Sequence, residues 1–160
     1  MDFDFVWTDG NNEVFRHFYL ITEDYYSSLV GGRENRSSFI PYNISSAIEN
    51  VLLVFCNDTP VACSGLKRYS DTEAEIKRVW VEPGYRGKHI ASKMMQHLEE
   101  KAKQFGFSRL ILQTREIMPD AVGLYKSFGY HRINNYPPYD TLDGAICLAK
   151  EISDLSSEKH

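Results

Sequence analysis

The sequence contains little of what marks a membrane, secreted or metal-binding protein. No apolar run approaches the roughly 20 residues needed to span a bilayer, and the first ten residues carry acidic side chains where a signal peptide carries basic ones. Its three cysteines, Cys56, Cys63 and Cys147, lie within apolar stretches and not at metal-ligand spacings. We therefore expect a cytoplasmic protein with reduced core thiols and no metal site.

Positive charge is also scarce. The chain has 18 Lys and Arg against 22 Asp and Glu, a formal net charge of −4, so it has no general attraction to nucleic acid and any anion site must be local. Hydrophobic residues make up 42% and charged residues 25% of the 160 residues, which predicts one folded domain. We expect this domain to span residues 1–152 and the polar residues 153–160 to form a flexible tail.

Hydrophobic periodicity predicts alternating strands and helices. Helical spacing predicts helices over residues 12–29, 90–105 and 119–128. Runs rich in β-formers predict strands at residues 50–56, 61–69, 75–81, 109–113, 130–134 and 145–150. The first three strands follow one another through turns, which favours antiparallel pairing, whereas the strands on either side of the second helix should pair in parallel. The fold class is therefore α/β, with a mixed sheet flanked by helices.

The second helix has an apolar face and follows a turn with the composition of an anion site. We expect the apolar face to consist of Ala91, Met94, Met95, Leu98, Ala102 and Phe105. In the turn before it, residues 84–89, successive backbone N–H groups can converge on a pyrophosphate at the helix N-terminus. Gly87 allows close backbone approach, and Arg86, Lys88, His89 and Lys93 add positive charge. The alternative is a solvated basic turn, which is common in α/β proteins.

Two stretches resemble a known family. The segment AEIKRVWVEPGYRGKHIASKMMQHLEEKAKQFGFSRLILQT is similar to the central motif of the GNAT family of N-acetyltransferases, including its R/Q-x-x-G-x-G/A loop. The later DAVGLYKSFGYHRI resembles the second motif of that family, A-x-x-L-Y-x-x-x-G-F/Y. The resemblance covers about residues 51–152. It implies a single-domain fold whose mixed, mostly antiparallel sheet is splayed between two central strands.

The resemblance implies acetyl-CoA as the cofactor, with its pantetheine arm on the third predicted strand and its pyrophosphate in the loop 86–91. The residues implied to bind it are Val79, Trp80, Val81, Arg86, Gly87, Lys88, His89, Ile90, Ala91, Tyr125 and Lys126. His89 stands where the loop usually has glycine, which strains the turn if its φ is positive. Met118 stands where many members have an asparagine that bonds the cofactor, so that bond is expected to be lost.

Two residues are candidates for the chemistry, since acyl transfer to an amine needs a base for the ammonium and a proton for the leaving thiolate. Glu75 has the offset from Arg86 at which some family members place a general base. Its alternative role is a strand carboxylate that pairs with a neighbouring Lys or Arg. Tyr125 matches the tyrosine that can protonate the thiolate in relatives, and its alternative role is packing.

The acceptor site is expected in two segments on which relatives place acceptor contacts. The candidate residues are Arg33, Arg36, Tyr42, Asn43, Tyr136 and Tyr139. Arginines and tyrosines together suit a small acceptor that bears a carboxylate.

The sequence thus predicts an enzyme that acetylates a primary amine of a small molecule from acetyl-CoA in a ternary complex. The alternatives are a protein acetyltransferase acting on a lysine or N-terminus, and a non-catalytic module that senses acyl-CoA. No nucleic-acid or membrane partner is expected, and a homodimer is compatible with the sequence.

Overall fold

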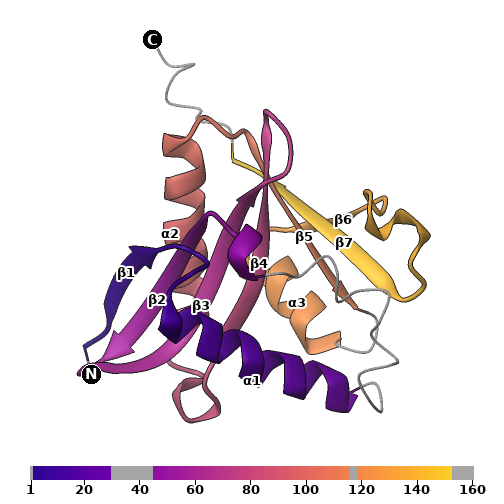
Figure 1. Cartoon of the computed structure of the whole chain (residues 1–160). Coiled ribbons are helices and arrows are strands. Elements are labelled where there is room, and N and C mark those ends of the chain that lie inside the picture. The colour runs from indigo at the N-terminus through magenta and orange to yellow at the C-terminus, as the bar shows by residue number, and fades with distance from the viewer. Residues whose placement is uncertain (1, 30–44, 116–118, 153–160) are drawn as a thin grey trace. The chain divides into compact units, whose positions relative to one another are not determined.

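The computed structural model describes residues 2–29, 45–115 and 119–152 (Figure 1). The helices are α1 (Glu13–Leu29), α2 (Ile90–Gln104) and α3 (Pro119–Ser127), with short 3-10 turns at Ser45–Ala47, Pro83–Tyr85 and Tyr139–Thr141. The strands are β1 (Asp4–Thr8), β2 (Asn50–Cys56), β3 (Thr59–Arg68), β4 (Glu73–Val81), β5 (Arg109–Arg115), β6 (His131–Ile133) and β7 (Ala145–Glu151). The predicted helices and strands are all present, and β1 is an addition.

The strands of the described residues form a mixed sheet in the order β1-β2-β3-β4-β5-β7-β6. Strands β1 and β2, and β2 and β3, pair antiparallel. Strand β7 pairs antiparallel with both β5 and β6. Strand β4 pairs parallel with β5, with Glu75 beside Ile111. The predicted mixed sheet and its parallel pair around α2 are thereby confirmed.

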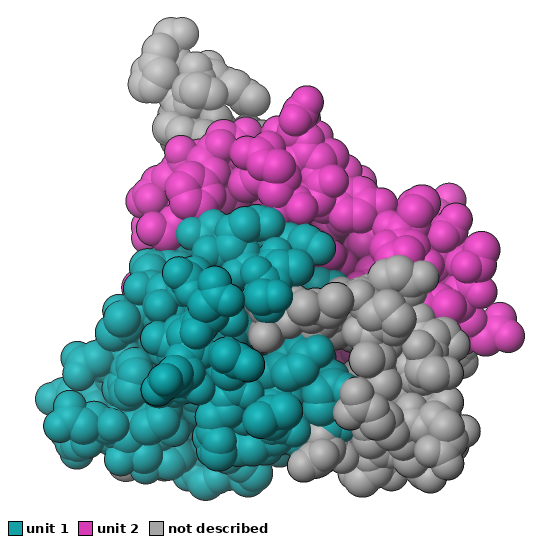
Figure 2. Space-filling model, viewed as in Figure 1, with its two compact units in different colours: residues 1–67, 77–94 teal, residues 68–76, 95–160 magenta. Residues whose placement is uncertain are grey.

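The chain divides into two compact units, which Figure 2 colours separately. Unit 1 contains residues 1–67 and 77–94, and unit 2 contains residues 68–76 and 95–160. Strand β4 and helix α2 each contribute residues to both units.

Unit 1 packs one helix on each face of its strands, because β2 is apolar on both faces. Phe15 and Phe18 of α1 pack with Val51 and Leu53 of β2. Residues Ile90 and Met94 of α2 pack with the alternate β2 residues Leu52, Val54 and Cys56. Successive side chains of a strand point to opposite faces of the sheet. A continuous apolar run such as NVLLVFC can therefore pack against a helix on each face.

The sequence does not predict strand β1, because its hydrophobic pattern is short and weak. Its sequence DFVWT has only five residues, begins with an acid and has no fully buried side chain. Its pairing with β2, from Asp4 opposite Phe55 to Thr8 opposite Val51, defines it as a strand. Tertiary pairing, and not local preference, therefore makes this segment extended.

The β2–β3 hairpin is tighter than the sequence suggested. The prediction placed Thr59 and Pro60 in the turn, but both belong to β3 and the turn is Asn57–Asp58 alone. Both turn residues have positive φ, 49° and 70°, which is the conformation that two-residue hairpins require. Pro60 lies opposite Phe55 next to a register irregularity, a place in a sheet where proline is tolerated.

In unit 2 the end of α2 departs from the predicted apolar face. Phe105 was expected to be buried, but it is 48% exposed, because the helix ends at Gln104. The N–H of Gly106 (φ 88°) bonds to Lys103 O at 3.0 Å, and the N–H of Phe107 bonds to Ala102 O at 2.9 Å. This Schellman-type ending turns Phe107, which is 5% exposed, into the core in place of Phe105.

None of the described helices is long and apolar enough to cross a membrane. Cys56, Cys63 and Cys147 are free and buried, as predicted.

Candidate functional site

The turn between β4 and α2 in unit 1 has a backbone that can bind an anion. Gly87 has φ 79° and His89 has φ 64°, so two left-handed residues alternate with ordinary ones. Within the described part of the chain, the backbone N–H groups of residues 87–91 have no hydrogen-bond partner. A Cβ built on Gly87 would meet no atom within 4 Å, so the space above the turn is open. These features fit a pyrophosphate bound by backbone N–H groups.

His89 stands where the loop of the family usually has glycine, and its backbone conformation is the one that glycine favours. Its φ is positive, so the turn carries backbone strain. Its carbonyl oxygen accepts bonds from Lys93 N at 3.2 Å and Ser92 Oγ at 3.0 Å, which anchor the first turn of α2.

The Arg86 side chain supports the turn and the end of β4. Its Nε donates to Val81 O at 2.9 Å, and its guanidinium carbon lies 4.9 Å from the centre of the Trp80 ring. Val79 and Val81 are half-buried on the α2 side of β4, and Trp80 packs in the core beneath α1. Of the remaining candidates, Lys88 and His89 are exposed, Ile90 is buried and Ala91 is half-buried.

Unit 1 also contains a buried ion pair that the sequence did not predict. The guanidinium of Arg78, on β4, pairs with Glu23 of α1, and the two side chains are only 4% and 6% exposed. Arg78 Nη1 also donates to Thr22 Oγ1 at 3.2 Å, and its guanidinium lies 4.3 Å from the Tyr19 ring centre. Arg78 has φ 54°, an irregular point in β4, and its carbonyl oxygen accepts a bond from Cys63 Sγ at 3.4 Å. The pair therefore links α1 to the irregular part of the strand.

In unit 2, Glu75 and Tyr136 form a buried hydrogen-bonded pair. The Tyr136 hydroxyl donates to Glu75 Oε2 at 2.7 Å, and Glu75 and Tyr136 are 5% and 9% exposed. Burial, and next the charge of Glu75 and this hydrogen bond, raise the pKa of Tyr136 well above its usual value. The hydroxyl therefore keeps its proton and the carboxylate is the acceptor.

Two further tyrosines enclose Tyr136. Tyr139, which is 1% exposed, lies edge-to-face with Tyr136 at a ring-centre distance of 5.5 Å. Tyr69 lies edge-to-face on Tyr136 at 4.9 Å, and its hydroxyl donates to Pro137 O at 2.6 Å. Tyr69 was missed because nothing in its local sequence marks it. Its role follows from a contact 68 residues away in the chain.

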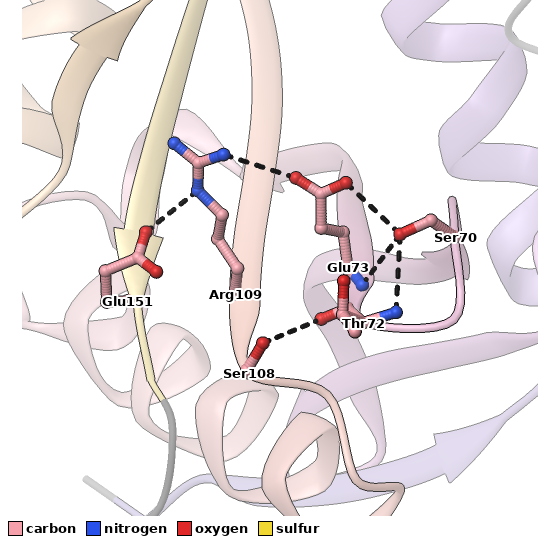
Figure 3. Close-up of polar contacts among 6 residues, drawn as sticks. All are labelled: Ser70, Thr72, Glu73, Ser108, Arg109 and Glu151. Atoms are coloured by element: carbon pink, nitrogen blue, oxygen red, sulfur yellow. Dashed lines mark hydrogen bonds and ion pairs between the residues drawn. The ribbon is translucent and has the colours of Figure 1, made fainter.

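A polar network holds the start of β4, two residues before Glu75 (Figure 3). The guanidinium of Arg109 is paired with Glu73 at 3.3 Å and with Glu151 at 2.8 Å, which ties together the neighbouring strands β4, β5 and β7. The hydroxyl of Ser70 donates to Glu73 Oε1 at 3.1 Å, and Ser108 bonds the carbonyl of Thr72. The backbone that carries Glu75 is therefore fixed in register with β5.

Tyr125 and Lys126 lie in α3, which packs against β5. The Tyr125 ring is half-buried and lies edge-to-face with Tyr130 at 6.1 Å. Its carbonyl oxygen accepts the N–H of Tyr130 at 3.1 Å, so the tyrosine is held at the C-terminal end of the helix. Lys126 is exposed.

The other candidates fall on undescribed positions. Arg33, Arg36, Tyr42, Asn43 and Met118 all lie outside the described residues. Within the described ranges, no three His, Cys, Asp or Glu side chains are grouped as a metal site would need.

Comparisons with known proteins connect this geometry to a family. The model of the Acetyltransferase (GNAT) family matches residues 7–130. The chain is 31% identical over 84 residues to the IAA acetyltransferase of Azospirillum brasilense, a match that covers 51% of this chain and 54% of that protein. It is 27% identical over 97 residues to the uncharacterized N-acetyltransferase YsnE of Bacillus subtilis, covering 59% and 64%. The chain thus spans less than two thirds of either relative.

Solved structures share the fold at low identity. A GNAT-family acetyltransferase of Staphylococcus aureus has a TM-score of 0.73 at 17% identity, with 95% of this chain and 100% of that chain covered. The PaiA N-acetyltransferase of Thermoplasma acidophilum, in complex with coenzyme A, has a TM-score of 0.71 at 16% identity, with 94% and 99% covered. At such identities the likeness establishes the α/β fold and no residue's role.

Proposed function

The chain belongs to the GNAT family of acetyltransferases, and on that premise we propose that it transfers an acetyl group from acetyl-CoA to a primary amine of a small molecule. The acceptor attacks directly within a ternary complex, because the reaction requires no covalent enzyme intermediate. The observation that carries the proposal is the β4–α2 turn, where the N–H groups of residues 87–91 bond no described residue and the space at Gly87 is open.

Residues 86–91 hold the pyrophosphate of the cofactor through backbone N–H groups and the N-terminal end of α2. Arg86 acts as a brace for the turn, because its side chain is bonded to Val81 O. The backbone of Val79 and Val81 holds the pantetheine arm, and a backbone N–H near Val79 polarises the acetyl carbonyl. The cofactor supplies an acetyl group activated as a thioester.

Glu75 and Tyr125 move the protons. The Glu75 carboxylate takes a proton from the acceptor ammonium through water, and the Tyr125 hydroxyl gives a proton to the departing thiolate. Lys126 contributes positive charge beside Tyr125.

The acceptor contacts are proposed to come from Arg33, Arg36, Tyr42, Asn43 and Tyr136, with Tyr139 behind Tyr136. A small-molecule acceptor is favoured by the name of one relative, the IAA acetyltransferase, and agrees with the name of a structural neighbour, a nourseothricin acetyltransferase. We place the activity in the cytoplasm, since three free buried thiols suit a reducing compartment.

The test is an assay of the full chain with radiolabelled acetyl-CoA and a panel of amines that includes amino acids, polyamines and lysine peptides. Transfer to a small amine, abolished or strongly reduced in Glu75→Gln, supports the proposal. Transfer only to peptides would select the protein acetyltransferase. Tight acetyl-CoA binding with no transfer to any amine would select an acyl-CoA sensor.

A further inference from the structure

We propose that Arg78 and Glu23 are positioning residues for the acetyl carbonyl, because they hold the irregular point of β4 that directs the N–H of Val79. The inference rests on the proposed function, in which a backbone N–H near Val79 polarises that carbonyl. Its basis is the left-handed conformation of Arg78, with φ 54°, together with the buried ion pair that joins its guanidinium to Glu23 of α1.

The irregular point of β4 lies shortly after the end of its ladder with β5. This parallel ladder runs from Glu73 opposite Arg109 to Ile76 opposite Leu112, and Arg78 follows farther along the strand. A left-handed residue turns the next peptide group away from the direction that a regular strand would give it. In a residue other than glycine this conformation costs free energy and persists only where surrounding contacts determine it.

One face of α1 supplies three contacts for the Arg78 guanidinium. The guanidinium is paired with Glu23, its Nη1 donates to Thr22 Oγ1 at 3.2 Å, and its carbon lies 4.3 Å from the centre of the Tyr19 ring. Tyr19, Thr22 and Glu23 lie on the same side of α1, because they are spaced by one helical turn. The Thr22 hydroxyl donates to Tyr19 O at 3.0 Å, so its lone pairs face Arg78. This part of α1 therefore fits a planar guanidinium from two edges and a face.

The backbone of Arg78 is held separately, from β3. Its carbonyl oxygen accepts a bond from Cys63 Sγ at 3.4 Å. Burial raises the pKa of the Cys63 thiol, although the charge of Arg78 acts in the opposite direction, so the thiol keeps the proton that it donates. The side chain and the carbonyl of Arg78 are thus fixed by two different elements of unit 1.

The residues after Arg78 follow regular alternation. The side chains of Arg78 and Trp80 lie on the α1 side of β4, and those of Val79 and Val81 lie on the α2 side. The direction of the Val79 N–H therefore depends on the conformation of Arg78. A donor polarises a carbonyl most effectively when it already points at the carbonyl oxygen. Release of Arg78 should accordingly weaken the polarisation without removing any group that contacts the cofactor.

Infrared difference spectroscopy of the full chain with acetyl-CoA, labelled with ¹³C at the acetyl carbonyl, measures this polarisation directly. The thioester carbonyl stretch moves to lower frequency when a hydrogen-bond donor polarises it. The test variant is Glu23→Leu with Arg78→Met, which removes both charges and so leaves no partner of this ion pair buried alone. The wild type should show the shift on binding, and the double variant should lose most of it. A full shift in the double variant would overturn the proposal.

Glu99→Leu with Lys150→Met is the matched control. It makes the same kind of change in another ion pair between a helix and a strand, in which Lys150 Nζ of β7 lies 3.0 Å from Glu99 Oε2 of α2. The carbonyl shift should equal that of the wild type. A loss as large as in the Glu23→Leu, Arg78→Met variant would refute a specific effect of Arg78.

A milder variant keeps the proposal testable if the double variant does not fold. Thr22→Val removes the hydroxyl that accepts the bond from Arg78 Nη1 and leaves the ion pair with Glu23 in place. It should lose a smaller part of the carbonyl shift. An unchanged shift in Thr22→Val would count against the proposal.

Kinetics separate a positioning role from a role in binding. With the amine of the panel on which the wild type is most active, kcat of Glu23→Leu, Arg78→Met should fall by roughly 100-fold. The KM for acetyl-CoA should change little, because the β4–α2 turn is intact. A raised KM with an unchanged kcat would overturn the positioning role.

Failure of the proposed function would look different. A wild type that binds acetyl-CoA without any carbonyl shift would remove the Val79 N–H from the proposed function, and the positioning role of Arg78 would fall with it. A shift of equal size in the wild type and the double variant would overturn the positioning role alone and leave the proposed function in place.

Discussion

His89 and Arg78 both have positive φ, although neither is a glycine, and in each case the surroundings account for it. His89 ends the β4–α2 turn, where its carbonyl oxygen accepts bonds from Lys93 and Ser92. Arg78 is held by its pairing with Glu23 and by the Cys63 thiol at its carbonyl. Strained residues persist only where neighbouring contacts determine the conformation, and they tend to cluster at functional sites. Both flank the part of β4 that we propose for the cofactor.

Replacing Tyr125 by Phe tests whether its hydroxyl acts as the proposed acid. In Tyr125→Phe the ring remains beside Tyr130, so folding and acetyl-CoA affinity should persist. If the hydroxyl protonates the leaving thiolate, turnover should fall by roughly 100- to 10,000-fold. Single-turnover kinetics with acetyl-CoA measure this loss.

The control for Tyr125 is a series of acyl donors whose thiols differ in acidity. A more acidic thiol leaves more easily and needs the proton less, so the deficit of Tyr125→Phe should shrink along the series. A constant deficit would mean that Tyr125 positions the thioester without donating a proton, and a loss of only a few-fold would favour a packing role.

Among the helices and strands, the sequence predicts those whose signals are local. Helix α2 was found from its periodicity and its glycine end, and the parallel β4–β5 pair followed from the crossover. Strand β1 escaped because it has no buried side chain, and Phe105 was misplaced because the Schellman ending puts Phe107 in the core. The basic, glycine-containing turn was expected at residues 84–89, and α2 does begin directly after it, at Ile90. The Arg78–Glu23 and Tyr136–Glu75 pairs were not expected, since each joins residues more than 50 positions apart.

The Arg78–Glu23 pair anchors α1 to β4, so its loss should lower stability. Glu23→Ala leaves the buried guanidinium of Arg78 without its carboxylate, so the free energy of unfolding should fall by about 3–5 kcal/mol. Urea denaturation measures the loss. The double variant Glu23→Leu with Arg78→Met removes both charges, and most of the stability should return. If the double variant is as unstable as Glu23→Ala, an unpaired charge is not the cause.

Binding of acetyl-CoA should raise the free energy of unfolding of the folded chain. Residues 82–89 join β4 to α2, and both elements contribute residues to unit 1 and unit 2. A ligand bound only to the folded chain adds RT ln(1 + [L]/Kd), about 2.7 kcal/mol at a concentration of 100 Kd. For a chain of this length that corresponds to a rise in Tm of about 5–10 °C, measured by calorimetry with and without acetyl-CoA.

Two glycines of this segment provide a matched pair of variants that tests where the ligand binds. A Cβ on Gly84 or on Gly87 meets no atom within 4 Å, but only Gly87 has a positive φ, 79°. Gly87→Ala should therefore distort the turn, cost about 1 kcal/mol without ligand and reduce the rise in Tm caused by acetyl-CoA. Gly84→Ala should keep the full rise, because its backbone accommodates alanine. An equal rise in wild type and both variants would place the pyrophosphate elsewhere, and no rise in the wild type would contradict acetyl-CoA binding itself.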